Sequence, residues 1–230
     1  MTDFKCPKCK GAGVIVYVED GVDYAKPCEC VAVRNSQIMI AKSGLAKDFE
    51  SKSFDNFNPC GKSQLADAKK TAVKFTKKII SGEDNCPWMM LCGQVGAGKT
   101  HLGTACCSTL MNNGFAVVYM PFRESMTFLK TKLLDSDVYG KEIEKYKTTP
   151  VLYIDDFLKG KTTESDVNIL FEILNYRYQN DKTVILSTEK NLNELIRFDE
   201  AIASRLIQKS RGYIVELKGK ELNYRLYGCQ

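Results

Sequence analysis

The eight-residue run GQVGAGKT, residues 93–100, constrains the fold of this chain more than any other feature. It matches the pattern G-x-x-x-x-G-K-[ST], in which glycines allow backbone N–H groups to close around phosphate oxygens. An apolar run precedes it at residues 88–92, and a helix-compatible segment follows it. A strand, a glycine-rich loop and a helix in this order predict a phosphate-binding loop. The alternative is a glycine-rich turn beside an unrelated lysine.

The loop itself supplies the first candidate site residues. Those expected around the phosphates are Gly93, Gln94, Val95, Gly96, Ala97, Gly98, Lys99, Thr100 and His101. Lys99 is expected to reach the outer phosphates, and the hydroxyl of Thr100 to ligate Mg²⁺. We therefore expect ATP and Mg²⁺ as the ligands of this loop.

The rest of the chain from residue 87 alternates short apolar runs with helical segments. The predicted strands are 88–92, 115–120, 150–155, 183–188 and 213–217, and the predicted helices are 99–112, 122–134, 164–179 and 192–209. This alternation predicts an α/β fold with a parallel sheet covered on both faces. Ligands of such sheets bind at the carboxyl ends of the strands, where the phosphate loop falls.

An amphipathic helix is predicted over residues 64–80, ahead of the first of these strands. Its polar face carries Lys70, Lys74, Lys77 and Lys78. This lysine face is either simply solvated or a surface that follows a phosphate backbone. Residues 31–60 show weak periodicity and are expected to form a connector.

Two acids end the apolar run VLYIDDF, residues 151–157. A carboxylate at this strand end can hold Mg²⁺, which we assign to Asp155, and the next one can orient or deprotonate water, which we assign to Asp156. A turn or helix-cap role is the alternative. Ser187 and Thr188 end the following run, so they are candidates for contact with the terminal phosphate or form an ordinary strand end.

Four cysteines form two pairs near the start of the chain: Cys6, Cys9, Cys28 and Cys30. The residues between the pairs predict a hairpin that turns at Asp20-Gly21, which would bring the pairs together. Four thiolates at these spacings predict a Zn²⁺ site, with free structural thiols as the alternative.

The other six cysteines, at positions 60, 86, 92, 106, 107 and 229, show no pairing pattern. Those around the phosphate loop, Cys92, Cys106 and Cys107, are expected in the core. A reducing compartment argues against disulfides.

Composition sets limits on location and class. The net charge of +5 is too mild to identify a nucleic-acid binder by itself. No stretch of about eighteen apolar residues occurs, and the first residues lack an apolar signal core. We expect a cytoplasmic protein without a membrane partner. Three parts are expected: a zinc-binding module (1–35), a connector (36–63) and an ATPase domain (64–230).

An ordered set of segments resembles the AAA+ helicase loaders of the DnaC/DnaI type, relatives of the transposition ATPase IstB. The segments are CPKCKGAG, PCEC, SGLAKDFESKSFDNF, GQVGAGKT, VLYIDDF, ILSTE, AIASRLIQ and GKELNYRL. The resemblance implies an AAA+ P-loop NTPase with a five-stranded parallel sheet, an N-terminal zinc hairpin and a minimal or absent C-terminal lid. It implies slow ATP hydrolysis, stimulated by DNA or a partner, by a replication protein that loads the replicative helicase onto single-stranded DNA.

Two other functions stay open. One is an IstB-like transposition helper that binds duplex DNA, and the other is an adaptor that binds nucleotide without hydrolysing much of it. Within the resemblance, the cysteine module is implied to dock onto the helicase. Asp156 stands where AAA+ proteins generally carry Glu, and Glu189 stands where many relatives carry Asn.

The resemblance also implies roles for residues late in the chain. Arg205, in AIASRL, matches the arginine finger that reaches a neighbouring subunit's γ-phosphate, which implies self-association with nucleotide bound. Arg225, in NYRL, matches a late arginine that acts as a second sensor.

Residues 121–147 match a region that contacts single-stranded DNA in the family. Phe122 and Phe128 would stack on bases, and Arg123, Lys130 and Lys132 would hold phosphates. Core packing is the alternative for the two phenylalanines.

Overall fold

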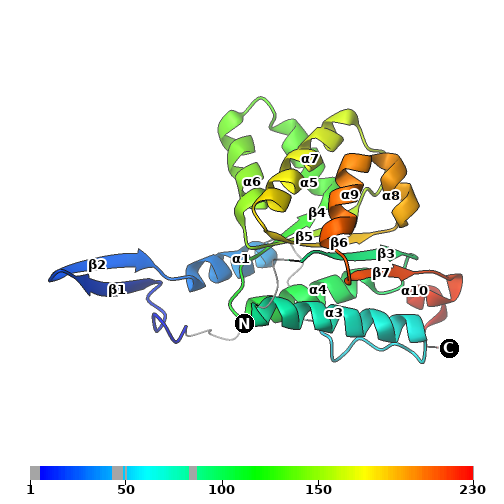
Figure 1. Ribbon diagram of the computed structural model, residues 1–230, viewed down its shortest axis with the longest axis horizontal. Helices are drawn as coiled ribbons and strands as arrows, with labels where there is room; N and C mark the ends of the chain where they lie inside the picture. Colours follow the sequence, from blue (N-terminus) through cyan, green and yellow to red (C-terminus); the bar gives the residue numbers. More distant parts are fainter. Residues whose placement is uncertain (1–5, 43–48, 50, 83–86, 230) are drawn as a thin grey trace.

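The computed structural model describes residues 6–42, 49, 51–82 and 87–229. Its centre is a five-stranded parallel sheet in the order β4-β5-β6-β3-β7 (Figure 1). The strands are β3 (Met89–Gly93), β4 (Val117–Pro121), β5 (Val151–Phe157), β6 (Thr183–Thr188) and β7 (Ile214–Leu217). Every predicted strand is confirmed to within two residues, because each is a short apolar run between turn or helix signals.

Helices cover both faces of this sheet (Figure 1). On one side lie α3 (Ser63–Ser81) and α4 (Lys99–Asn112). On the other side lie α5 (Phe122–Thr131), α6 (Ser136–Thr148), α7 (Glu164–Gln179), α8 (Leu192–Phe198) and α9 (Glu200–Lys209). None of the helices in the described ranges is both long and apolar enough to cross a bilayer.

The sheet has a hydrophobic core on each face, because successive side chains of a strand point to opposite faces. Successive β3 side chains enter opposite cores: Met89 and Leu91 pack with α3 and α4, whereas Met90 and Cys92 pack on the other face. Because both faces of the sheet are buried, its strands are almost continuously apolar instead of alternating.

The predicted helix 192–209 is in fact two helices. The chain is extended at Asp199, whose side chain accepts a hydrogen bond of 2.7 Å from the N–H of Ile202. An aspartate at the N-cap satisfies a backbone donor that would otherwise lack a partner, so it starts a new helix. The break lets α9 pack beside α7.

The N-terminal part is an antiparallel hairpin, β1 (Val14–Glu19) and β2 (Val22–Pro27), followed by α1 (Cys30–Lys42). The hairpin projects away from the sheet (Figure 1). The segment of weak periodicity expected as a connector contains the helix α1, and among its residues 30–38 one narrow strip is buried. There Val33 is buried, and Ser36 accepts a hydrogen bond of 3.1 Å from the N–H of Val117. The part boundaries at 35 and 63 stay predictions, and α1 runs across the first of them.

The C-terminal tail consists of a short 3-10 turn, η1 (Lys220–Leu222), and a one-turn helix, α10 (Tyr224–Tyr227). The minimal or absent lid stays a prediction. Gln64 fixes the start of the tail through two hydrogen bonds, to the C=O and from the N–H of Lys218, at 3.0 and 3.1 Å.

A disulfide joins Cys60 to Cys229, so the expectation of no disulfides was wrong at this pair. The two cysteines are 169 residues apart, and tertiary packing of the tail on the segment before α3 brings them together. The core placement of Cys92, Cys106 and Cys107 is confirmed. Cys86 lies outside the described residues.

Candidate functional site

A cavity of about 400 Å³ opens at the carboxyl edge of the sheet, over the phosphate loop (residues 93–100). Its walls come from six segments of the chain: the loop with the start of α4, residues 52–58, Leu65 of α3, the end of β5 with the turn after it, Glu189 after β6, and the tail. Val95 to His101 line the cavity, whereas Gly93 and Gln94 do not. The N–H of Gln94 donates to the C=O of Leu217 at 2.8 Å.

Two loop glycines are required by what packs against them. A Cβ on Gly96 would lie 2.1 Å from the side-chain oxygen of Asn223, and one on Gly98 would lie 2.6 Å from the ring of Phe57. Both also have positive φ, 75° and 85°. The tail and the segment before α3 therefore press directly on the loop and fix its shape.

Lys99 begins α4 and turns back over the loop. Its Nζ donates to the C=O groups of Gly93 and Gln94, both at 2.8 Å. Burial lowers the pKa of Lys99, and the nearby carboxylates of Glu189 and Asp156 oppose that shift. This lysine is thus folded back over the loop, and its expected contact with the outer phosphates stays a prediction.

Asp155 accepts hydrogen bonds from four hydroxyl groups. The distances are 3.2 Å from Thr100, 3.0 Å from Tyr119 and 2.8 Å from Tyr153, and Ser187 donates the fourth. The pKa of both tyrosines is raised, first by burial and then by this carboxylate. Thr100 and Asp155 thus present oxygens to one point, which is the donor chemistry that Mg²⁺ prefers.

The sequence analysis missed Tyr119 and Tyr153. Both lie in predicted strands, and Tyr153 stands two residues before the acid it contacts. The signal was a hydroxyl on an otherwise aliphatic strand next to the carboxyl edge. Such a hydroxyl needs a partner when it is buried, and the nearest candidate was Asp155.

Asp156 has φ of 55°, a left-handed conformation that is uncommon for a residue with a side chain. Its N–H donates to Ser187 Oγ at 3.0 Å, which helps hold the bend. Ser187 and Thr188 are both fully buried. Thr188 Oγ1 donates to the C=O of Phe157 at 2.8 Å, so this hydroxyl supports the turn after β5.

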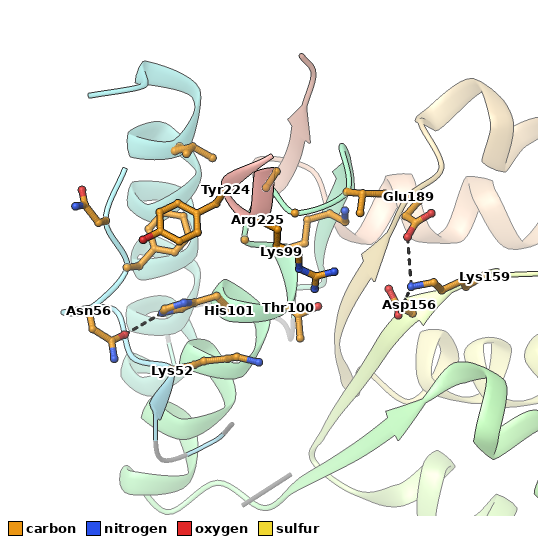
Figure 2. Close-up of a pocket in the computed structure, with 17 residues that line it drawn as sticks. Lys52, Asn56, Lys99, Thr100, His101, Asp156, Lys159, Glu189, Tyr224 and Arg225 are labelled. Carbon is orange, nitrogen blue, oxygen red and sulfur yellow. Dashed lines mark hydrogen bonds and ion pairs between the residues drawn. The ribbon is translucent and has the colours of Figure 1, made fainter. Parts of the chain in front are cut away.

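His101 connects the phosphate loop to residues 52–58. Its Nε2 lies 2.9 Å from both the C=O of Ser53 and the side-chain oxygen of Asn56, and its ring meets Phe57 edge-on. Figure 2 shows Asn56 and Lys52 on the same wall of the cavity as His101. These wall residues were not predicted, because they come from a segment without periodicity.

The two arginines lie in different places. Arg225 lines the cavity from the tail, and Tyr224 donates its N–H to the C=O of Gly96 at 3.0 Å. Arg205 does not line this cavity. Its Nε donates to Asn175 at 3.1 Å, and its guanidinium lies over Phe171, with 5.1 Å to the ring centroid. It therefore sits on the α7–α9 surface, away from the nucleotide loop of its own chain.

The predicted DNA residues on α5 separate into buried and open ones. Phe122 is only 3% exposed and packs against Phe157, so the core alternative holds and it is not placed to stack on a base. Lys130 forms an ion pair of 2.9 Å with the buried Asp166. Phe128 is 42% exposed, Arg123 is exposed, and Lys132 is half-buried.

The four N-terminal cysteines converge as predicted. All their sulfur atoms lie within 4.8 Å of one another, and the two closest pairs are Cys9–Cys30 at 3.4 Å and Cys6–Cys28 at 3.7 Å. A tetrahedral zinc with bonds of about 2.3 Å separates its sulfur ligands by about 3.8 Å. The donor set therefore fits zinc.

Backbone N–H groups stabilise the thiolate form of two of these cysteines, Cys6 and Cys9. The N–H of Cys9 is the main cause of the lowered pKa of Cys6. Burial raises the pKa of Cys9, but N–H groups led by that of Gly13 and a contact with Cys30 outweigh it and bring the value to about 6. Burial, followed by contacts with the other thiols, raises the pKa of Cys30 to about 12. A bound metal cation would favour the thiolate form of all four cysteines and so remove this difference between their pKa values.

The family match covers the part of the chain that forms the sheet and its helices. The family model of the bacterial DnaA ATPase domain matches residues 49–215, which leaves out the cysteine cluster and the tail. The phage-like element PBSX protein XkdC of Bacillus subtilis (strain 168) is 33% identical, over 99% of this chain and 88% of that protein.

Two solved structures share the fold. The DnaC helicase loader has a TM-score of 0.60 at 22% identity and covers 75% of this chain and all of its own. The replication initiator DnaA bound to AMPPCP and single-stranded DNA has a TM-score of 0.57 at 22% identity, over 75% of this chain and 51% of that one. The AAA+ fold is thereby confirmed, with the small N-terminal cysteine hairpin added to it. Because the family model spans more than half of its residues, the chain belongs to the family of the bacterial DnaA ATPase domain.

Proposed function

We propose that this protein is an ATPase of DNA replication that loads the replicative helicase onto single-stranded DNA. One observation carries the proposal: a single cavity is lined by Lys99, Thr100 and Asp156, and Thr100 donates a hydrogen bond to Asp155 beside it. Its family and fold are those of AAA+ replication ATPases, and a loader and a DNA-bound initiator share that fold.

Nucleotide binding would use the loop backbone and two cations. N–H groups at the start of α4 favour phosphate oxygens, and Lys99 needs only to leave two carbonyl groups to reach them. Arg225 would contact the phosphates from the tail. The ring of Phe57 and the side-chain amides of Asn56 and Asn58 would hold the nucleoside end of ATP.

Magnesium would supply charge neutralisation when bound, held by Thr100 and Asp155. The hydroxyls of Tyr119, Tyr153 and Ser187 keep the Asp155 carboxylate in one orientation. Asp156 would orient and deprotonate the attacking water. Ser187 fixes the backbone of Asp156, so its strained conformation aims the carboxylate into the cavity.

Partner contacts would use other surfaces. Arg205 would reach the γ-phosphate of a neighbouring copy, which requires it to leave Asn175 and Phe171. Single-stranded DNA would contact Arg123, Phe128 and Lys132, the open residues of the predicted set. The cysteine module, with zinc bound, would dock onto the helicase.

The activity is tested first by hydrolysis assays on Asp156→Asn. We expect turnover to fall by about 10²–10⁴-fold, the usual contribution of a general base, with ATP affinity nearly unchanged. Asp67→Asn, an exposed acid on α3, is the matched control. Unchanged turnover in Asp156→Asn would refute its assignment.

The loading function is tested with the purified replicative helicase. We expect the full chain to bind the helicase ring and single-stranded DNA to stimulate its ATPase. Cys6→Ser should weaken helicase binding and leave basal hydrolysis intact. Stimulation by duplex DNA alone, together with no helicase binding, would favour the transposition helper instead. No hydrolysis under any of these conditions would favour the adaptor.

A further inference from the structure

The turn after β5 holds a lysine that no role above uses. Asp156 and Leu158 both have positive φ, 55° and 59°, although neither is glycine. The N–H of Lys159 donates to the C=O of Asp156 at 3.0 Å, and the side chain of Leu158 is buried. This bend is therefore anchored on both sides, and it sets the direction in which Lys159 leaves the backbone.

Lys159 lies between two acids at the mouth of the cavity (Figure 2). Its Nζ is 2.8 Å from Asp156 Oδ2 and 3.4 Å from Glu189 Oε1. A hydrogen bond with Asp156 is the main cause of its raised pKa, so the lysine stays charged. The three side chains are 49%, 43% and 39% exposed, which leaves them accessible to a ligand in the cavity.

The charges of the site show why a cation is needed there. Asp156 and Glu189 line the same cavity as the phosphate loop, and their field is felt at Lys99. A nucleoside triphosphate held by the loop would place its last phosphate beside Lys99, on the side of the cavity that these acids line. Like charges repel strongly in a partly enclosed site, so a phosphate next to two carboxylates requires a cation between them.

We propose, building on the ATPase function above, that Lys159 recognises the terminal phosphate of the nucleotide. With a triphosphate bound, Lys159 leaves Asp156 and Glu189 and donates to the γ-phosphate oxygens. A diphosphate has no oxygen at that place, so Lys159 remains with the two acids. Lys159 thus distinguishes ATP from ADP, and only with ATP bound is the Asp156 carboxylate released for water.

A purely structural lysine is the competing explanation. An exposed ion pair contributes little to stability, so such a lysine would merely hold two side chains in place. It would affect ATP and ADP equally, because both would meet the same altered wall. The ratio of the two affinities therefore separates the explanations.

The test measures binding of a non-hydrolysable ATP analogue and of ADP to the full chain, by calorimetry with Mg²⁺ present. Because a charge-assisted hydrogen bond is lost, we expect Lys159→Gln to weaken the analogue about tenfold or more, with ADP affinity changed less than about twofold. Lys159→Arg should recover most of the discrimination. Lys161→Gln removes the same charge two residues away, outside the cavity lining, and should change neither affinity.

Each result decides the question. Equal weakening of both nucleotides, or no change in either, in Lys159→Gln would overturn the recognition of the terminal phosphate and leave the ATPase function standing. An unsubstituted protein that binds neither nucleotide would overturn the ATPase function and this inference together.

Discussion

The cysteine module and the sheet body bury cysteines for opposite reasons. In the module, four buried sulfur atoms face one another, and the half-buried apolar side chains of Ile15 and Val31 pack against them. In the body, Cys92, Cys106 and Cys107 are fully buried among apolar side chains. The residue type is the same, so the surroundings decide whether a thiol is a metal ligand or a small apolar group.

The pKa values express the same contrast. Burial raises the pKa of Cys92 and Cys106 to about 12, which keeps both as inert thiols. In the module, N–H groups close to the sulfur bring the pKa of Cys9 to about 6 despite burial. The hairpin beyond it is exposed along nearly its whole length and cannot supply a core. We therefore expect the module to depend on a bound metal and the body on its packing.

Metal removal should have the largest effect on this contrast. We expect the purified chain to hold one zinc, and a strong chelator to abolish the ordered structure of residues 6–34, because little else holds them. Amide hydrogen exchange should show lost protection there and unchanged protection in the sheet. Metal content by mass spectrometry checks the stoichiometry, with Cys107→Ala as the control that keeps the metal. Full protection of residues 6–34 in metal-free protein would contradict the contrast.

A core truncation should act on the body alone. Phe75 is fully buried on α3 and meets Tyr213 edge-on, with ring centroids 5.4 Å apart. Phe75→Ala should lower the free energy of unfolding by about 3–5 kcal/mol, since it removes an aromatic side chain and leaves a cavity. Urea unfolding followed by the fluorescence of the buried Trp88 measures this.

Two further measurements complete this test. The zinc content of Phe75→Ala should stay at the level of the unsubstituted chain. Phe128→Ala removes an exposed ring and should change stability by less than about 0.5 kcal/mol. Loss of zinc in Phe75→Ala would mean that the module and the body fold as one unit.

Asp166 is one of the buried charges of the body, and its removal should have the smallest effect of the three. Burial raises the pKa of Asp166, but hydrogen bonds from Lys130 and Thr163 outweigh it and leave the value below the ordinary one. A lowered folded-state pKa stabilises the protein above the unfolded-state value of about 3.9, and this contribution is lost as pH falls through the folded-state value.

Asp166→Asn should therefore cost about 1–3 kcal/mol at neutral pH, and the difference should shrink as both proteins are acidified. Urea unfolding at pH 7 and at pH 3 checks the sign. Asp137→Asn, an exposed acid in the first turn of α6, should cost less than about 1 kcal/mol at either pH. A cost for Asp166→Asn that does not depend on pH would show that only its capping of α7 matters.

Most of the sheet could be predicted from sequence because strands buried on both faces leave long apolar runs. The phosphate loop, Asp155 and the converging cysteines were predicted for a similar reason: their chemistry requires fixed residue types at short spacings. Helix α1 was missed because residues 30–38 bury only a narrow strip, which leaves a weak periodic pattern. The break at Asp199 was missed although its capping residue was visible.

The remaining parts of the site depend on contacts between distant segments. Phe57 and Asn223 press on the loop from segments more than 160 residues apart, and no local pattern encodes that meeting. The same holds for the disulfide between Cys60 and Cys229. Lys159 was overlooked because its importance arises from a bend with two left-handed residues, which residue type alone does not indicate.

The hydrogen bond from Tyr224 to Gly96 has a practical consequence for handling this protein. The one-turn helix α10 is thereby bonded to Gly96, a glycine of the loop that is expected to close around phosphate. An affinity tag fused after α10 would disturb the loop through this hydrogen bond, whereas a tag fused before β1 would be attached at the other end of the chain. Assays of nucleotide chemistry should therefore carry their handle at the amino terminus.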